Sequence, residues 1–71
     1  MSLNTELAIK YASMAADDLL NAVQLLHLLS DCSDQLTKDK QSMVRRDAAL
    51  RMASATRFTI IAMAFADRGA L

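Results

Sequence analysis

The sequence predicts an all-α protein and, within that class, a two-helix antiparallel hairpin. Three observations carry this prediction. The chain of 71 residues has no proline and one glycine. Alanine, leucine and methionine, which all favour helices, dominate its composition. Its apolar residues recur at spacings of three and four, the period of an amphipathic helix. No stretch alternates as a half-buried strand does, and the length fits a single domain, 1–71.

The first helix is expected over about residues 4–31, with Asn4 or Thr5 as its N-cap. Its apolar stripe consists of Ile9, Ala12, Ala16, Leu19, Val23 and Leu26. The positions beside this stripe are mostly apolar as well, so the polar residues form only a narrow strip. A helix this apolar needs more cover than one partner helix can give.

The turn is expected at about residues 32–38, within the only sustained polar stretch, residues 30–40, which offers Ser33, Thr37 and Asp39 as helix caps. Because this stretch contains neither glycine nor proline, one continuous helix is the alternative. Continuing the first stripe at the same spacing reaches mostly polar residues, so the change of phase favours a break. The second helix then covers about 39–68, with Gly69 as its C-terminal cap.

Small and large apolar residues are expected to divide between two contacts. The small ones form a seam on which the helices approach closely: Ala12, Ala15, Ala16, Ala48, Ala55 and Ala62. On the second helix, Phe58, Ile61 and Phe65 are expected on the side opposite this seam, against a second chain. The interface with that chain is predicted to comprise Leu19, Leu20, Val23, Leu26, Phe58, Ile61 and Phe65.

The size of the chain favours association. Below about 70–80 residues, one hydrophobic core seldom supplies more than about 3–5 kcal/mol. Cys32 is the only cysteine, so no disulfide can form within the chain. We therefore expect a homo-oligomer, most simply a dimer forming a four-helix bundle, or a complex with another helical protein. The expected function is protein–protein interaction, as an adaptor, regulatory or chaperone-like subunit.

The distribution of charge supplies the alternative function. Residues 1–35 carry one basic and five acidic side chains, a net −4, and residues 36–71 carry seven basic and three acidic ones, a net +4. Arg46, Arg57 and Arg68 recur every eleven residues, about three helical turns, with Arg51 beside this row. The row is a candidate phosphate contact in a nucleic-acid-binding dimer. The layout resembles, in architecture only, the Rop-type RNA-binding hairpin dimers. Solvation of the row, or its pairing with the acidic first helix, is the favoured interpretation.

Several other classes of function are disfavoured. His27, Asp31 and Cys32 lie within two helical turns but are too few and too mixed to specify a metal. Asp17 and Asp18 are adjacent and point in different directions, so they make no facing pair for acid–base catalysis. We therefore expect no enzyme and no catalytic residue, metal, cofactor or small-molecule substrate.

The sequence gives weaker indications of the cellular compartment and of membrane contact. The most apolar window, residues 58–66, is shorter than the about 20 residues that cross a bilayer, so no membrane segment is expected. The single cysteine fits a cytoplasmic location.

Overall fold

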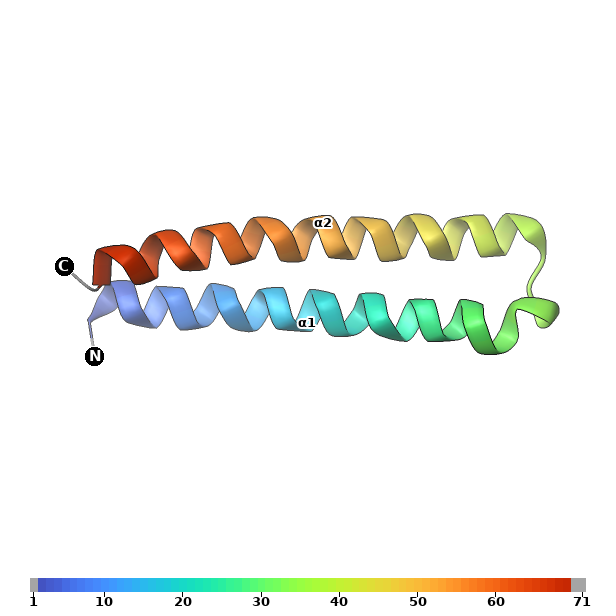
Figure 1. Cartoon of the computed structure of the whole chain (residues 1–71), viewed down its shortest axis with the longest axis horizontal. Coiled ribbons are helices and arrows are strands. Elements are labelled where there is room, and N and C mark those ends of the chain that lie inside the picture. Colours follow the sequence, from blue (N-terminus) through green and yellow to red (C-terminus); the bar gives the residue numbers. More distant parts are fainter. Residues whose placement is uncertain (1, 70–71) are drawn as a thin grey trace.

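A computed structural model describes residues 2–69 as two long helices lying side by side and antiparallel (Figure 1). Helix α1 spans Leu3–Cys32, a single 3-10 turn, η1, spans Ser33–Gln35, and helix α2 spans Lys38–Gly69. The prediction of an all-α hairpin is confirmed. The molecule measures 52 × 15 × 12 Å. We call the end at which α1 begins and α2 finishes the open end, and the opposite one the turn end.

Helix α1 begins earlier than the sequence indicated. Ser2 is extended, and its Oγ accepts a hydrogen bond from the backbone N–H of Thr5 at 3.2 Å. Ser2 is therefore the N-cap, and the prediction of Asn4 or Thr5 is wrong, because both residues already lie within the first helical turn.

The turn end is held by side chains rather than by glycine or proline. Thr37, one of the three predicted caps, accepts a hydrogen bond at Oγ1 from the N–H of Lys40 at 3.2 Å. Gln41 donates from Nε2 to the carbonyl oxygens of Ser33 at 2.8 Å and of Leu36 at 3.1 Å. These bonds satisfy backbone carbonyls where the chain reverses, so a polar stretch without glycine still makes a tight connection.

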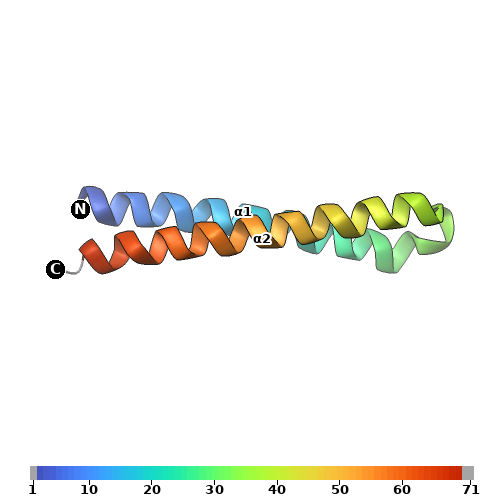
Figure 2. The same ribbon diagram turned by 90° about the horizontal axis from the view of Figure 1, so that it is seen from above.

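The seam between the helices is built from alanine at every seventh position. The buried apolar residues are Ala8, Ala15 and Ala22 on α1 and Ala48, Ala55 and Ala62 on α2. Seven residues are two helical turns, so each series keeps to one side of its helix when the helices supercoil. The crossing of α1 and α2 in Figure 2 agrees with such a supercoil. Small side chains at these positions let the two backbones approach closely.

Gly69 extends the α2 series by one more step of seven. It is the last residue of α2 and does not have a positive φ, so its predicted role as a left-handed cap is wrong. A Cβ at this position would lie 2.9 Å from Thr5 Oγ1. The Thr5 hydroxyl therefore occupies the space that a side chain at this position would need, while the nearest backbone atom, Thr5 N, would lie 3.5 Å away.

Candidate functional site

The two sides of the alanine seam differ in how they are covered. One side, which we call the aromatic side, carries Tyr11 of α1 stacked between Phe58 and Phe65 of α2. The centroid of the Tyr11 ring lies 5.9 Å from that of Phe58 and 5.8 Å from that of Phe65. Lys10 lies 5.9 Å from the Tyr11 ring centre, and the Arg68 guanidinium lies 5.6 Å from that of Phe65. Cations over ring faces are attracted by the ring quadrupole.

This stack corrects the predicted position of the phenylalanines. Phe58 follows Ala55 by three residues and precedes Ala62 by four, so it flanks the seam instead of lying opposite to it. Phe58 and Phe65 are half-buried within the hairpin, and Ile61, between them on the same side, is 37% exposed.

An ion pair continues the aromatic side toward the turn end. Arg51 Nη1 lies 3.5 Å from Asp18 Oδ1, and the Asp18 side chain is 13% exposed. The second carboxylate oxygen, Oδ2, is buried and has no hydrogen-bond partner among the described residues. This side of the hairpin is thus closed by large or charged side chains.

The other side of the seam remains open as a long depression, which we call the alanine groove. Three adjoining hollows form it, and the one at the open end has a volume of about 480 Å³. Its floor is made of small residues: Ala8, Ala12, Ala15, Ala16, Ala55, Thr59, Ala62 and Ala66. Its walls include Ile9, Leu19, Met52, Ile60 and Met63. A further hollow continues it along α1 and is lined by Val23, Leu26, His27 and Ser30.

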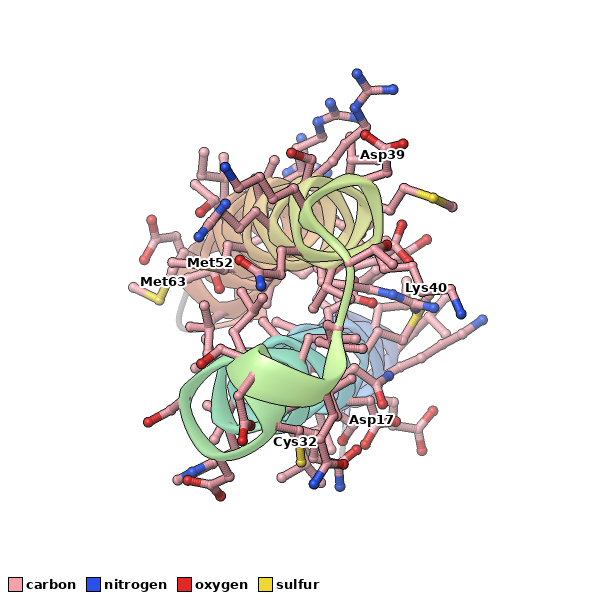
Figure 3. All side chains as sticks on the ribbon, turned by 90° about the vertical axis from the view of Figure 1, so that its right-hand side faces the viewer. Asp17, Cys32, Asp39, Lys40, Met52 and Met63 are labelled. Atoms are coloured by element: carbon pink, nitrogen blue, oxygen red, sulfur yellow. The ribbon has the colours of Figure 1, made fainter. Side chains whose placement is uncertain are left out.

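The walls of the alanine groove are well exposed. Leu19 is 51% and Met63 58% exposed, and no described residue that lines the three joined hollows is charged. Figure 3 looks along the hairpin from the turn end and places Met52 and Met63 on one side of α2, with Lys40 on the other. One side of this small protein is therefore apolar and uncharged over much of its length.

The predicted interface residues fall into two groups and one separate residue, Leu20. Leu19, Val23 and Leu26 lie together along the alanine groove and its extension. Leu20 is 56% exposed and lines none of the hollows described above. The other three, Phe58, Ile61 and Phe65, belong to the aromatic side. Contact of any of the seven residues with a second chain stays a prediction.

The groove also changes the assignment of two predicted seam residues and adds new ones. Ala12 and Ala16 are exposed and form its floor, while Ala8 and Ala22, which the sequence analysis left out of the seam, are buried. Met52, Ile60 and Met63 were not among the predicted interface residues. Alanine at every seventh residue is the sequence signal for the buried seam. Once the seam is located, the residues beside it on each helix are the ones that line the groove.

The four arginines of the candidate polyanion site are in different situations. Arg51 pairs with Asp18, and Arg68 lies over the Phe65 ring. Arg46 and Arg57 are exposed on the surface of α2. Two members of the set are thus already engaged within the chain, and binding of a polyanion by the row stays a prediction.

The next two findings concern metal ligands and the length and hydropathy of α2. Within residues 2–69, no three His, Cys, Asp or Glu side chains gather closely enough to hold a metal ion. By length and composition alone, α2 is apolar enough to span a bilayer, with a mean hydropathy of 1.2 over 18 residues, of which 17% are buried.

The chain matches no protein-family model, no curated protein and no solved structure. Fold and surface define it as a helical hairpin with an exposed, uncharged alanine groove on one side.

Proposed function

We propose that this chain is a protein–protein interaction module that associates through its alanine groove, with two hairpins forming a four-helix bundle. The observation that carries the proposal is the groove itself, a long apolar surface without a charged residue among those that line the joined hollows. Exposed apolar surfaces of this kind mark sites of association in soluble proteins. Such a bundle would serve as a small adaptor, regulatory or chaperone-like subunit.

The small core supports association. Among the described residues, every buried apolar residue is an alanine and no larger side chain is fully buried. Alanine buries little apolar area, so the contact between α1 and α2 supplies little of the hydrophobic free energy that a stable fold needs. A single hairpin of this size is expected to be marginal, and a second one would supply the missing burial.

The exposed area supports the same conclusion. The chain exposes 5337 Å², whereas a compact monomer of 7.8 kDa exposes about 4,400 Å². The excess of about 900 Å² reflects the elongated shape of the hairpin, 52 × 15 × 12 Å, which leaves room for the about 800 Å² that each partner contributes to a standard protein interface.

Protein is a better cover for this surface than lipid. Arg51 and Arg57 lie near the middle of α2 and would enter the hydrocarbon if this helix spanned a bilayer. Each arginine at the centre of a membrane helix costs about 2.5–3.5 kcal/mol on insertion scales. A helical protein partner buries the apolar groove and leaves both arginines in water.

The test is the mass in solution of variants with a charge in the groove. Leu19→Glu and Met63→Glu each place a carboxylate on an exposed wall position, so neither change disturbs a buried contact within the hairpin. Leu50→Glu is the matched control, because Leu50 is 60% exposed and lines none of the hollows. We expect the wild-type chain and the control to be dimers at low micromolar concentration. The two groove variants should raise the dimer dissociation constant at least about tenfold, or 1.4 kcal/mol.

Light scattering measures the mass, and far-ultraviolet circular dichroism confirms helicity at the same concentrations. A wild-type chain that is monomeric throughout would contradict self-association and would direct the search to another helical protein. Groove variants with wild-type mass and helicity would show that a different surface mediates association.

A further inference from the structure

The alanine groove carries opposite charges at its two ends. Toward the turn end, Arg45 precedes Met52 of the groove wall by seven residues, and Arg46 precedes Ile60 by fourteen. Steps of seven keep to the same side of a supercoiled helix, so both arginines lie in line with the groove residues of α2. Both side chains are exposed.

At the open end the charges are acidic. Asp67 follows Ile60 by seven residues, and Glu6 lies one residue after Thr5 and three before Ile9, which both line the groove. Both carboxylates are exposed. Lys38 and Asp39, at the start of α2, have opposite charges and largely offset each other. The apolar groove is therefore bordered by two arginines at one end and two carboxylates at the other.

We infer that the alanine groove binds a second copy of this chain in the antiparallel orientation, with the turn end of each hairpin over the open end of its partner. This inference rests on the proposed function, since it specifies the occupant and its direction. In this orientation Arg45 and Arg46 of each copy lie near Asp67 of the other, and the Glu6 carboxylate lies at the same end of the groove as Asp67. In the parallel orientation, like charges meet at both ends of the groove.

The geometry of a two-fold axis agrees with this arrangement. Identical surfaces meet in a symmetric dimer, so the axis must pass midway between the groups that pair. The midpoint between Arg45 and Asp67 along α2 is Thr56, which itself lines the alanine groove. Rotation about an axis at Thr56 places residues 52–60 of the groove over the same residues of the partner and the hollow at the open end over the partner's extension along α1, while the charged ends meet. Charges at the rim of an interface set orientation and register more than affinity, which the apolar floor and walls supply.

Spin-label distances test the orientation directly. Cys32 is the only cysteine, so single labels are introduced in a Cys32→Ser background. Gln35→Cys places a label in η1 at the turn end, and Ser13→Cys places one near the middle of α1. Both positions are exposed and line none of the groove hollows. Pulsed electron–electron double resonance then measures the distance between the labels on the two copies.

The two labels separate the outcomes. In an antiparallel dimer the Gln35 labels lie at opposite ends of a particle about 52 Å long, so their distance should exceed about 45 Å. In a parallel dimer they lie within about 30 Å, the width of two or three helices. The Ser13 labels lie within about 30 Å in either dimer, because they are close to the level of the axis.

A short Ser13 distance together with a long Gln35 distance supports the inference. Short distances for both labels overturn it while leaving the proposed dimer in place. If neither label gives a distance and light scattering finds a monomer, the proposed self-association fails, and the inference fails with it.

A charge-reversal series gives an independent readout. Arg46→Glu and Asp67→Lys should each raise the dimer dissociation constant several-fold, and the two changes combined should return it to within about twofold of wild type. Equal values for the single and double variants would overturn the antiparallel contact.

Discussion

Gly69 and Thr5 form a close contact where α2 finishes and α1 begins. A Cβ on Gly69 would lie 2.9 Å from Thr5 Oγ1 and 3.6 Å from Ser2 Oγ. These two hydroxyl oxygens are themselves hydrogen-bonded at 2.9 Å, and Ser2 caps α1. The last residue of one helix is thereby packed against the cap of the other, so the open end is held as well as the turn end.

Gly69→Ala should therefore fail to stabilise the protein. Alanine favours a helix interior over glycine by about 1 kcal/mol and the last residue by less, and here the new Cβ must displace Thr5 Oγ1 and its bond to Ser2. In a Thr5→Ala background the obstruction is absent, so the same change should be more favourable by about 1 kcal/mol. Thermal unfolding at one fixed protein concentration measures the four free energies. Equal effects of Gly69→Ala in the two backgrounds would rule out the close contact.

The alanine seam makes a second prediction. Ala22 is 1% exposed, so Ala22→Leu inserts a larger side chain where the helices approach closely. Overpacking of this kind should lower the unfolding free energy by about 1–3 kcal/mol. Ala64→Leu is the matched control on an exposed position of α2 that lines no hollow of the groove, and it should change stability by less than about 0.5 kcal/mol. Chemical denaturation compares the two variants, and equal stabilities would contradict the close seam.

The hairpin could be predicted from the sequence because its signals are local. Missing glycine and proline, helical periodicity and a polar stretch at residues 32–38 each act within a few residues. The confirmed architecture depends on little else. Ser2 was missed although its capping bond to Thr5 is local, whereas Gly69 was misassigned because its contact with Thr5 lies across the open end, and spacing along one helix does not reveal a contact between two.

The buried core was harder to predict, because selecting core residues by hydrophobicity favours large side chains over alanine. Ile9, Leu19 and Val23 dominate the predicted stripe, yet they are 51%, 51% and 41% exposed, whereas Ala8 and Ala22 are buried. A close helix contact selects small side chains, so the large ones are moved to its edges. Which of the two edges stays open could not be predicted, because that depends on Tyr11 filling the space beside Phe58 and Phe65.

The aromatic stack gives a third prediction. Phe58→Ala and Tyr11→Ala should each lower the unfolding free energy, by about 2–3 kcal/mol, because both remove half-buried ring area. The pair should show a coupling energy of about 0.5–1.5 kcal/mol in a double-mutant cycle, since the two rings are in contact. Denaturant unfolding followed by circular dichroism supplies the four values. A coupling energy near zero would mean that the rings do not stack in solution.

The turn end provides the last prediction, from the two bonds that Gln41 donates. Gln41→Glu keeps the shape of the side chain but removes both N–H donors and directs a carboxylate at the carbonyl oxygens of Ser33 and Leu36. The new negative charge lies in the first turn of α2, where the helix dipole alone would stabilise it by about 0.3–1 kcal/mol. Loss of the two bonds should outweigh this gain, for a net destabilisation of about 1–2 kcal/mol.

Gln35→Glu is the control, because Gln35 is exposed in η1 and its side chain makes none of the hydrogen bonds that tie the turn. It should leave the unfolding free energy within about 0.5 kcal/mol of wild type. Hydrogen exchange at the backbone amides of residues 36–42 then distinguishes a local effect from a global one. Faster exchange in this segment, confined to the Gln41 variant, is expected from a turn held by the Gln41 amide. If Gln41→Glu instead raised the stability, the helix dipole would be the stronger influence, and the turn would need another source of order.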